Sequence, residues 1–199
     1  SLKLSEQDPQ EIEKLFDELD NLTRNVFVEL KNEMDNYFAK RYKISKEKLA
    51  PWHYQNRFFQ EAPQIYSLDL DKYYKEKDVV ELTNVYFKGI GLPIDDMLAK
   101  SDLYEKPGKN QHAFCIDINR EGDVRVLCNV KNNAMWMNTM LHEFGHAVYN
   151  QKINPELPFE LRDPAHTFTT EAIAMMFGRL NSNPAWLRDN VGISESEMK

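Results

Sequence analysis

The chain has 199 residues, of which 42% are hydrophobic and 29% charged, with a net charge of −7 and a pI of about 5.3. This composition is typical of a globular domain with a core of its own, and the acidic balance argues against a nucleic-acid binder, which needs a basic face. Two cysteines, Cys115 and Cys128, exclude a disulfide scaffold and a cysteine zinc ribbon. No apolar run approaches ~18 residues and no signal segment opens the chain, so we expect no membrane contact. The compartment is left open, with a cytoplasmic location favoured.

The first part of the chain predicts one long amphipathic helix. Asp8 can cap it, Pro9 suits its first position, and Glu11 lies three residues after the cap. Apolar residues follow with a 3.6-residue period, so the helix is expected to run to about residue 40 and to pack against the core, with a coiled coil as the alternative. The apolar residues are Ile12, Leu15, Phe16, Leu19, Leu22, Val26, Leu30, Met34 and Phe38.

Residues 45–66 predict a short helix capped by Ser45 and interrupted by Pro51 and Pro63. His53 has no partner at a ligand spacing, so a structural role is expected for it. The aromatic residues of this stretch are expected in the core rather than in a ligand cage, namely Trp52, Tyr54, Phe58, Phe59 and Tyr66. Further helices are predicted over residues 71–90, 93–100, 133–151 and 166–181, with a last short helix starting at Asn183-Pro184.

Residues 112–130 predict a β-hairpin, because apolar and polar residues alternate on both sides of the sequence Arg-Glu-Gly-Asp at 120–123. A two-residue turn at 121–122 sets Cys115 opposite Cys128. A three-residue loop closed by Gly122 shifts the register and puts them on opposite faces. A disulfide between the two cysteines is therefore left open.

The sequence Thr-Met-Leu-His-Glu-Phe-Gly-His-Ala-Val-Tyr at 139–149 indicates a metal site. His142 and His146 are four residues apart, so a helix puts both imidazoles on one face, while Glu143 can reach a water on the same metal. The alternative is a helix whose two histidines are solvated or satisfied in the core.

The rest of this segment predicts a buried helix. Met137, Leu141, Phe144 and Val148 form an apolar stripe, with the histidines on another edge. Gly145 costs about 1 kcal/mol relative to alanine inside a helix. A glycine there suggests the close approach of another segment, for which the hairpin is the nearest candidate.

A catalytic zinc needs a third protein ligand and an open position. A third histidine six residues after His146 is excluded, because that position is Lys152. Glu171 is the better candidate, since a lone carboxylate in a nearly all-apolar helix has a large desolvation cost unless it is paired or bound to metal. The alternative is an ion pair with Arg179 or Arg162. Weaker ligand candidates are Glu156 and Glu160 in a Pro-flanked loop, and His166, which suits the helix start or the substrate side.

Two histidines, a glutamate and an open position predict metal-assisted amide hydrolysis. Zinc polarises a carbonyl and lowers the pKa of its bound water, and Glu143 accepts the proton of that water and later donates it to the leaving amine. The sequence offers no Tyr/His pair to stabilise the tetrahedral intermediate. Tyr149 lies on the same face, but we expect it to pack.

With these residues in place, the chain resembles the gluzincin peptidases, in particular the thimet oligopeptidase / oligopeptidase F and angiotensin-converting-enzyme-like groups. The order of hairpin, His-Glu-Phe-Gly-His helix, loop and Thr-Glu-Ala helix covers about residues 85–190. The resemblance implies one zinc ion held by His142, His146 and Glu171, with Glu143 as the catalytic base. It also implies a mainly α, zincin-like core with a small antiparallel hairpin beside the zinc helix. His112 and Ala113 match the edge strand that pairs with short peptide substrates.

Two departures from these families limit the expectation. Met175 stands where converting-enzyme-like members have an acidic residue, which leaves the orientation of the histidines to other partners. The families have a Tyr/His cluster well downstream of the glutamate, so residues 1–199 are expected to be a single catalytic domain or an internal fragment. Its apolar surfaces would then favour self-association. A non-catalytic, zinc-stabilised peptide-binding module or an inactive fragment is the alternative to an active oligopeptidase or peptidyl-dipeptidase.

Overall fold

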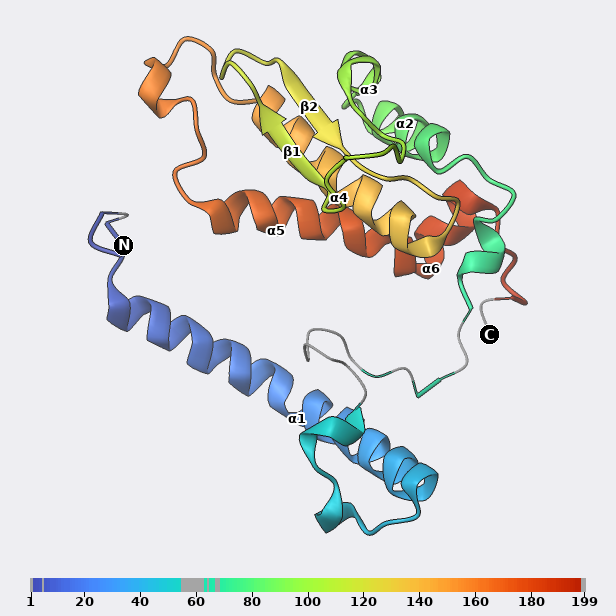
Figure 1. Cartoon of the computed structure of the whole chain (residues 1–199). Coiled ribbons are helices and arrows are strands. Elements are labelled where there is room, and N and C mark those ends of the chain that lie inside the picture. The colour runs from blue at the N-terminus through green and yellow to red at the C-terminus, as the bar shows by residue number, and fades with distance from the viewer. Residues whose placement is uncertain (1, 5, 55–62, 64, 67–68, 198–199) are drawn as a thin grey trace. The chain divides into compact units, whose positions relative to one another are not determined.

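The computed structural model describes residues 2–4, 6–54, 63, 65–66 and 69–197. The chain divides into two compact units, residues 1–68 and residues 69–199, which are described separately (Figure 1). In the described residues no helix is long and apolar enough to cross a bilayer.

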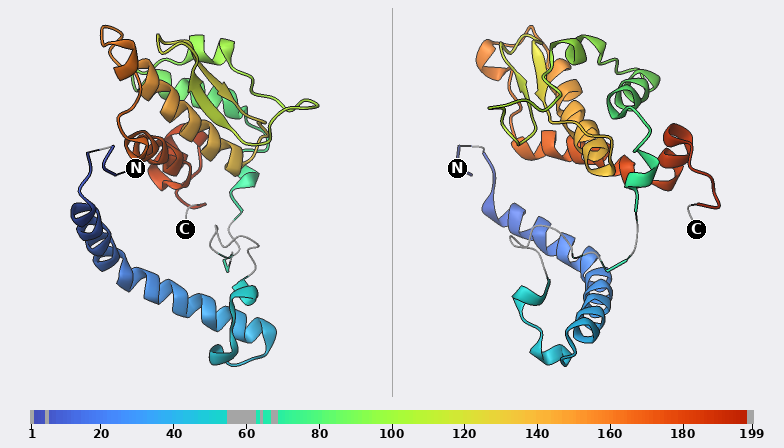
Figure 2. Two further views of the ribbon diagram at one scale, coloured as in Figure 1. Left: turned by 60° about the vertical axis from the view of Figure 1, so that its left-hand side comes forward. Right: turned by 45° about the vertical axis from the view of Figure 1, so that its right-hand side comes forward.

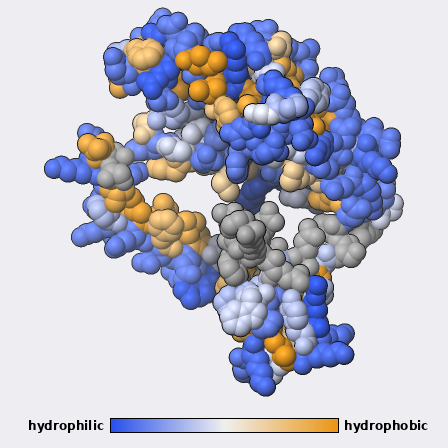
Figure 3. All heavy atoms as spheres, in the orientation of Figure 1, coloured by the Kyte–Doolittle hydropathy of each residue, from blue (hydrophilic) through white to orange (hydrophobic). Residues whose placement is uncertain are grey.

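Helix α1 (Pro9–Tyr42) dominates the first unit and begins as predicted. The Asp8 side chain accepts a hydrogen bond from the backbone N–H of Gln10, and the helix ends at Lys43, whose φ is 55°. Within this unit, the apolar stripe of α1 has little packing over most of its length. Only Met34 and Phe38 are buried, whereas the stripe from Leu15 to Leu30 is exposed, as the apolar side chains along α1 in Figure 3 illustrate. An amphipathic pattern gives the face of a helix but not the element that covers it.

Two short 3-10 turns follow α1, η1 (Lys46–Lys48) and η2 (Pro51–Tyr54). His53 is structural as predicted, because its Nδ1 accepts a hydrogen bond of 2.8 Å from the backbone N–H of Ala50. Trp52 and Tyr66 are exposed, which corrects their expected place in the core. Phe58 and Phe59 lie outside the described residues.

The second unit begins with a 3-10 turn and two short helices: η3 (Asp71–Tyr73), α2 (Val79–Gly89) and α3 (Asp95–Lys100). The single helix predicted over 71–90 is therefore shorter. Asp78 caps α2 by accepting hydrogen bonds from the N–H groups of Val80 and Glu81, which fixes the helix start after the turn.

Strands β1 (Phe114–Asp117) and β2 (Val124–Leu127) form the predicted antiparallel hairpin, with Cys115 opposite Val126. The connection is longer than either predicted turn. The Asn119 side chain accepts hydrogen bonds from the N–H groups of Glu121 and Asp123, and Gly122 adopts a φ of 92°. Cys128 is therefore two positions out of register with Cys115 on the same face, and both cysteines are free.

The remaining elements are helical and complete the predicted mainly α fold, which has one small sheet in the described residues. The hairpin lies over α4, and α5 runs beside α4 (Figures 1 and 2). The core gathers apolar residues from α2, α4, the hairpin and the C-terminal helices. These further elements are α4 (Ala134–Gln151), η4 (Phe159–Leu161), α5 (Thr167–Gly178), η5 (Arg179–Ser182), α6 (Pro184–Trp186) and the π-helical turn η6 (Leu187–Val191).

Candidate metal centre

Helix α4 holds both histidines of the motif. Asn133 caps the helix by accepting a hydrogen bond of 2.9 Å from the N–H of Trp136. The predicted apolar stripe is buried, which fixes the rotation of the helix about its axis and turns His142 and His146 to the edge facing α5. The two imidazole rings are neighbours, with centroids 4.8 Å apart.

Gly145 allows α5 to pack against α4. A Cβ atom on Gly145 would lie 2.9 Å from Cα of Ala174 and 3.0 Å from Cδ2 of Phe177. The segment that approaches Gly145 is therefore α5 and not the hairpin that the sequence suggested. Because the nearest atom is backbone, α5 could not come this close to a larger residue.

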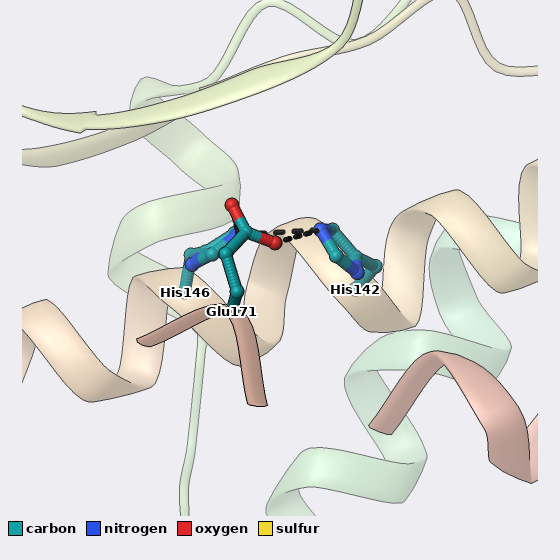
Figure 4. A group of neighbouring side chains, drawn as sticks. All are labelled: His142, His146 and Glu171. Carbon is teal, nitrogen blue, oxygen red and sulfur yellow. Dashed lines mark hydrogen bonds and ion pairs between the residues drawn. The ribbon is translucent and has the colours of Figure 1, made fainter. Parts of the chain in front are cut away.

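Glu171 lies on α5 and points towards both histidines (Figure 4). Its carboxylate oxygens are 3.5 Å from Nε2 of His142 and 3.5 Å from Nε2 of His146. Arg162 pairs with Glu121 instead of Glu171. The expected burial of Glu171 is wrong, because its side chain is 47% exposed. Desolvation therefore does not identify this glutamate; its position opposite the two histidines does.

The spacing of the three donor groups fits a metal ion. The two Nε2 atoms are 3.2 Å apart, and each lies 3.5 Å from a carboxylate oxygen of Glu171. Ligands at about 2.1 Å from a tetrahedral zinc are separated from each other by about 3.4 Å. His142, His146 and Glu171 are accordingly a group whose ligand atoms converge well enough to hold an ion.

Burial also affects the protonation of the two histidines. It lowers the pKa of His142 and of His146, although the nearby Glu171 carboxylate acts in the opposite direction. A lowered pKa favours the neutral imidazole, which is the form that binds metal.

Glu143 lies beside this group in a cavity of about 400 Å³. The residue is only 8% exposed. Burial, and to a smaller degree the negative charge of Glu171, raises the pKa of Glu143 to about 7. A carboxyl group with this pKa can both accept and release a proton near neutral pH.

The other predicted residues lie in different places around the centre. Ala113 lines the cavity just before β1, whereas His112 is exposed and does not line it. His166 is the N-cap residue of α5, consistent with a helix-start position, and its ring stacks on Phe168. Tyr149 faces a separate apolar cavity. Glu156 in the loop and Glu160 in η4 are exposed and belong to no converging group in the described residues.

Thr170 is a site residue that the sequence interpretation missed. Its Oγ1 is 2.7 Å from Nδ1 of His146, and it lines the same cavity as Glu143. The available signal was a pair of hydroxyl residues, Thr169 and Thr170, directly before Glu171 in a mostly apolar helix. Residues from three elements and the connecting loop complete the lining, namely Phe114, Cys115, Asn150, Asp163, Pro164 and Thr167.

Comparison with known proteins agrees with a metal centre of this kind. No curated protein matches the chain. A family model does match, and it describes the carboxypeptidase Taq (M32) metallopeptidases and covers residues 41–196. This range includes the hairpin, both helices of the site and all four residues discussed as ligands or base. The chain therefore belongs to the M32 carboxypeptidase Taq family of metallopeptidases.

Proposed function

We propose that this chain carries the catalytic centre of a zinc peptidase that hydrolyses peptide bonds in short peptides. The observation that supports it most directly is the convergence of His142, His146 and Glu171 on one point, with the buried Glu143 in the same cavity. The word carboxypeptidase in the family description favours cleavage near the C-terminus of the peptide within this class of reaction. The thimet oligopeptidase and converting-enzyme-like resemblance supports the same class of reaction.

In this proposal His142, His146 and Glu171 hold the zinc ion, and Glu143 moves protons. A bound zinc ion polarises the scissile carbonyl and lowers the pKa of water. Glu143 accepts a proton from the attacking water and donates it to the leaving amine, for which its raised pKa is suited. Its burial keeps competing solvent away from the carboxylate.

Strand β1 offers a backbone edge on which a peptide can lie. The Ile118 N–H donates to the Asp123 carbonyl, so these residues form a hydrogen-bonded pair. Hydrogen-bonded and non-hydrogen-bonded pairs alternate along an antiparallel hairpin, which makes Cys115 and Val126 a non-hydrogen-bonded pair. It follows that the N–H and C=O of Cys115 point away from β2. Val126, opposite Cys115, also directs its own backbone groups outwards, to Ser101 Oγ and the Asp102 N–H.

Cys115 and Ala113 both line the metal cavity, so a substrate backbone added to this edge would pass beside the metal ligands. Ala113 is therefore the stronger of the two predicted substrate-binding residues. His112 would contact only a longer peptide, because it precedes the strand and lies outside the cavity.

The experiment that tests the proposal is Glu143→Gln. We expect this variant to keep its zinc, because Glu143 is not among the ligands, and to lose peptide hydrolysis by about 10²–10⁴-fold, the contribution typical of general acid–base catalysis. Glu160→Gln in the exposed loop is the matched control and should retain full activity. Unchanged hydrolysis by Glu143→Gln would contradict the role of Glu143.

A non-catalytic, zinc-stabilised peptide-binding module is the second candidate. It is favoured by the cavity lining, which in the described residues includes no tyrosine and no histidine beyond His142 and His146 as a donor for the transition state. Zinc-loaded protein that binds short peptides but cleaves none of them would support this candidate over the peptidase.

A further inference from the structure

His146 uses its two ring nitrogens for two different partners on α5. Nε2 faces Glu171, 3.5 Å from Oε1, whereas Nδ1 lies 2.7 Å from Oγ1 of Thr170. The Thr170 residue is only 9% exposed. Two consecutive residues of α5 thus contact opposite sides of one imidazole ring.

The hydrogen bond of Thr170 differs from those that three other helical threonines make. Thr23, Thr83 and Thr139 each donate to the carbonyl oxygen four residues earlier in their own helix. That local bond is the usual one for threonine within a helix. The hydroxyl of Thr170 instead contacts a side chain on the neighbouring helix, which indicates that it serves the site and not the helix.

We propose that Thr170 is a positioning residue that fixes the tautomer and the ring orientation of His146 for metal binding. Nδ1–H donates to Oγ1 of Thr170, which leaves the lone pair of Nε2 free to face the metal. Neutral imidazole carries only one N–H, so placing the proton on Nδ1 decides which nitrogen can be a ligand.

Thr170 also supplies the histidine partner that is missing one turn after Glu171. The position one turn after Glu171 is Met175, which is 56% exposed and cannot orient a histidine by hydrogen bonding. Partners behind a metal-bound histidine raise its affinity for the metal by restricting the ring. In this chain the neutral hydroxyl of Thr170, the residue before Glu171, is the partner behind the histidine. The third ligand and the positioning group then move together with α5.

The test measures zinc affinity by competition with a chromophoric chelator, and it rests on the proposed metal site. Thr170→Val keeps the shape of the side chain but removes the hydrogen-bonding oxygen. We expect it to weaken zinc binding by about 10–100-fold, the usual effect of losing such a partner. Thr170→Ser keeps the hydroxyl and should restore affinity close to that of the unaltered protein. Thr139→Val, which removes an exposed hydroxyl bonded within α4, is the matched control and should bind zinc normally.

The thermal unfolding of the metal-free variants separates positioning from folding. A positioning role predicts that Thr170→Val unfolds at or above the temperature of the unaltered protein without zinc, and gains less stability when zinc is added. Normal zinc affinity in Thr170→Val would overturn this inference and leave the proposed function intact. Equal loss of affinity in Thr170→Ser and Thr170→Val would also overturn it, since the hydroxyl would not be the active group. Absence of zinc binding by the unaltered protein would overturn both proposals.

Discussion

Helices α4 and α5 carry the candidate ligands, and they differ in burial. Nine of the 18 residues of α4 are buried, including Glu143, whereas only four of the 12 residues of α5 are buried. Phe168, Met175 and Met176 on α5 are exposed. The histidines are therefore held by the more deeply buried helix, while Glu171 depends on how closely one face of α5 approaches Gly145.

The deeper burial of α4 first predicts a large loss of stability when one of its buried side chains is shortened. Leu141 is fully buried one residue before His142. Leu141→Ala should reduce the free energy of unfolding by about 2–5 kcal/mol, because it removes apolar contacts and leaves a cavity. Urea unfolding of the metal-free protein measures this value. A loss below about 1 kcal/mol would contradict the close packing of this side of α4.

The contact between the two helices should be the next most sensitive point. Gly145→Ala places a Cβ against the backbone of Ala174, so the helices must move apart. We expect a loss of about 1–3 kcal/mol from overpacking. Zinc affinity should fall as well, because Glu171 moves away from the histidines. Gly89→Ala on α2 is the matched control, since nothing lies within 4 Å of its added Cβ. Unaltered zinc affinity in Gly145→Ala would contradict the dependence of Glu171 on this contact.

Burial of Glu143 should make the metal-free protein sensitive to pH. Folding raises the pKa of Glu143 from 4.5 to about 7, so the folded state favours the protonated form. This contribution is fully present below pH 4.5 and is lost as the pH rises through about 7.

Glu143→Gln does not titrate and should therefore be more stable than the unaltered metal-free protein above pH 7. The gain above pH 7 should be about 1–3 kcal/mol, and it should vanish below pH 4.5. Unfolding curves at pH 4 and pH 8 provide the measurement. A gain of equal size at both pH values would show that ionisation of Glu143 is not its cause.

The smallest effect is expected on the exposed face of α5. Met175 is 56% exposed, so Met175→Ala should change the free energy of unfolding by no more than about 0.5 kcal/mol. The same unfolding assay compares it directly with Leu141→Ala. A loss approaching that of Leu141→Ala would mean that this face of α5 is covered in solution, which would remove the contrast between the two helices.

Local sequence features predicted the site helices well, because helix formation and the buried face of a helix depend on residues close in sequence. The His-Glu-x-x-His spacing puts His142 and His146 on one face, and the stripe through Leu141 and Phe144 gives the buried side. The position of Glu171 opposite the histidines also agrees with the expected ligand set, although its exposure does not agree with the desolvation argument.

The features that the sequence did not predict depend on tertiary contacts. The partner of Gly145 depends on which helix packs there, and the apolar residues of α5 do not reveal that Phe168, Met175 and Met176 are exposed. The register of the hairpin depends on hydrogen bonds of the Asn119 side chain within the loop. The contact between Thr170 and His146 joins residues 24 positions apart and has no local pattern.

The most direct test of the account is the zinc content of the purified protein after equilibration with zinc and removal of the excess. We predict one zinc ion per chain for the unaltered protein, and loss of bound zinc in Glu171→Ala, because two histidines alone do not complete the ligand set that the structure brings together. Stoichiometric zinc in Glu171→Ala, or none in the unaltered protein, would contradict the metal centre proposed for these two helices.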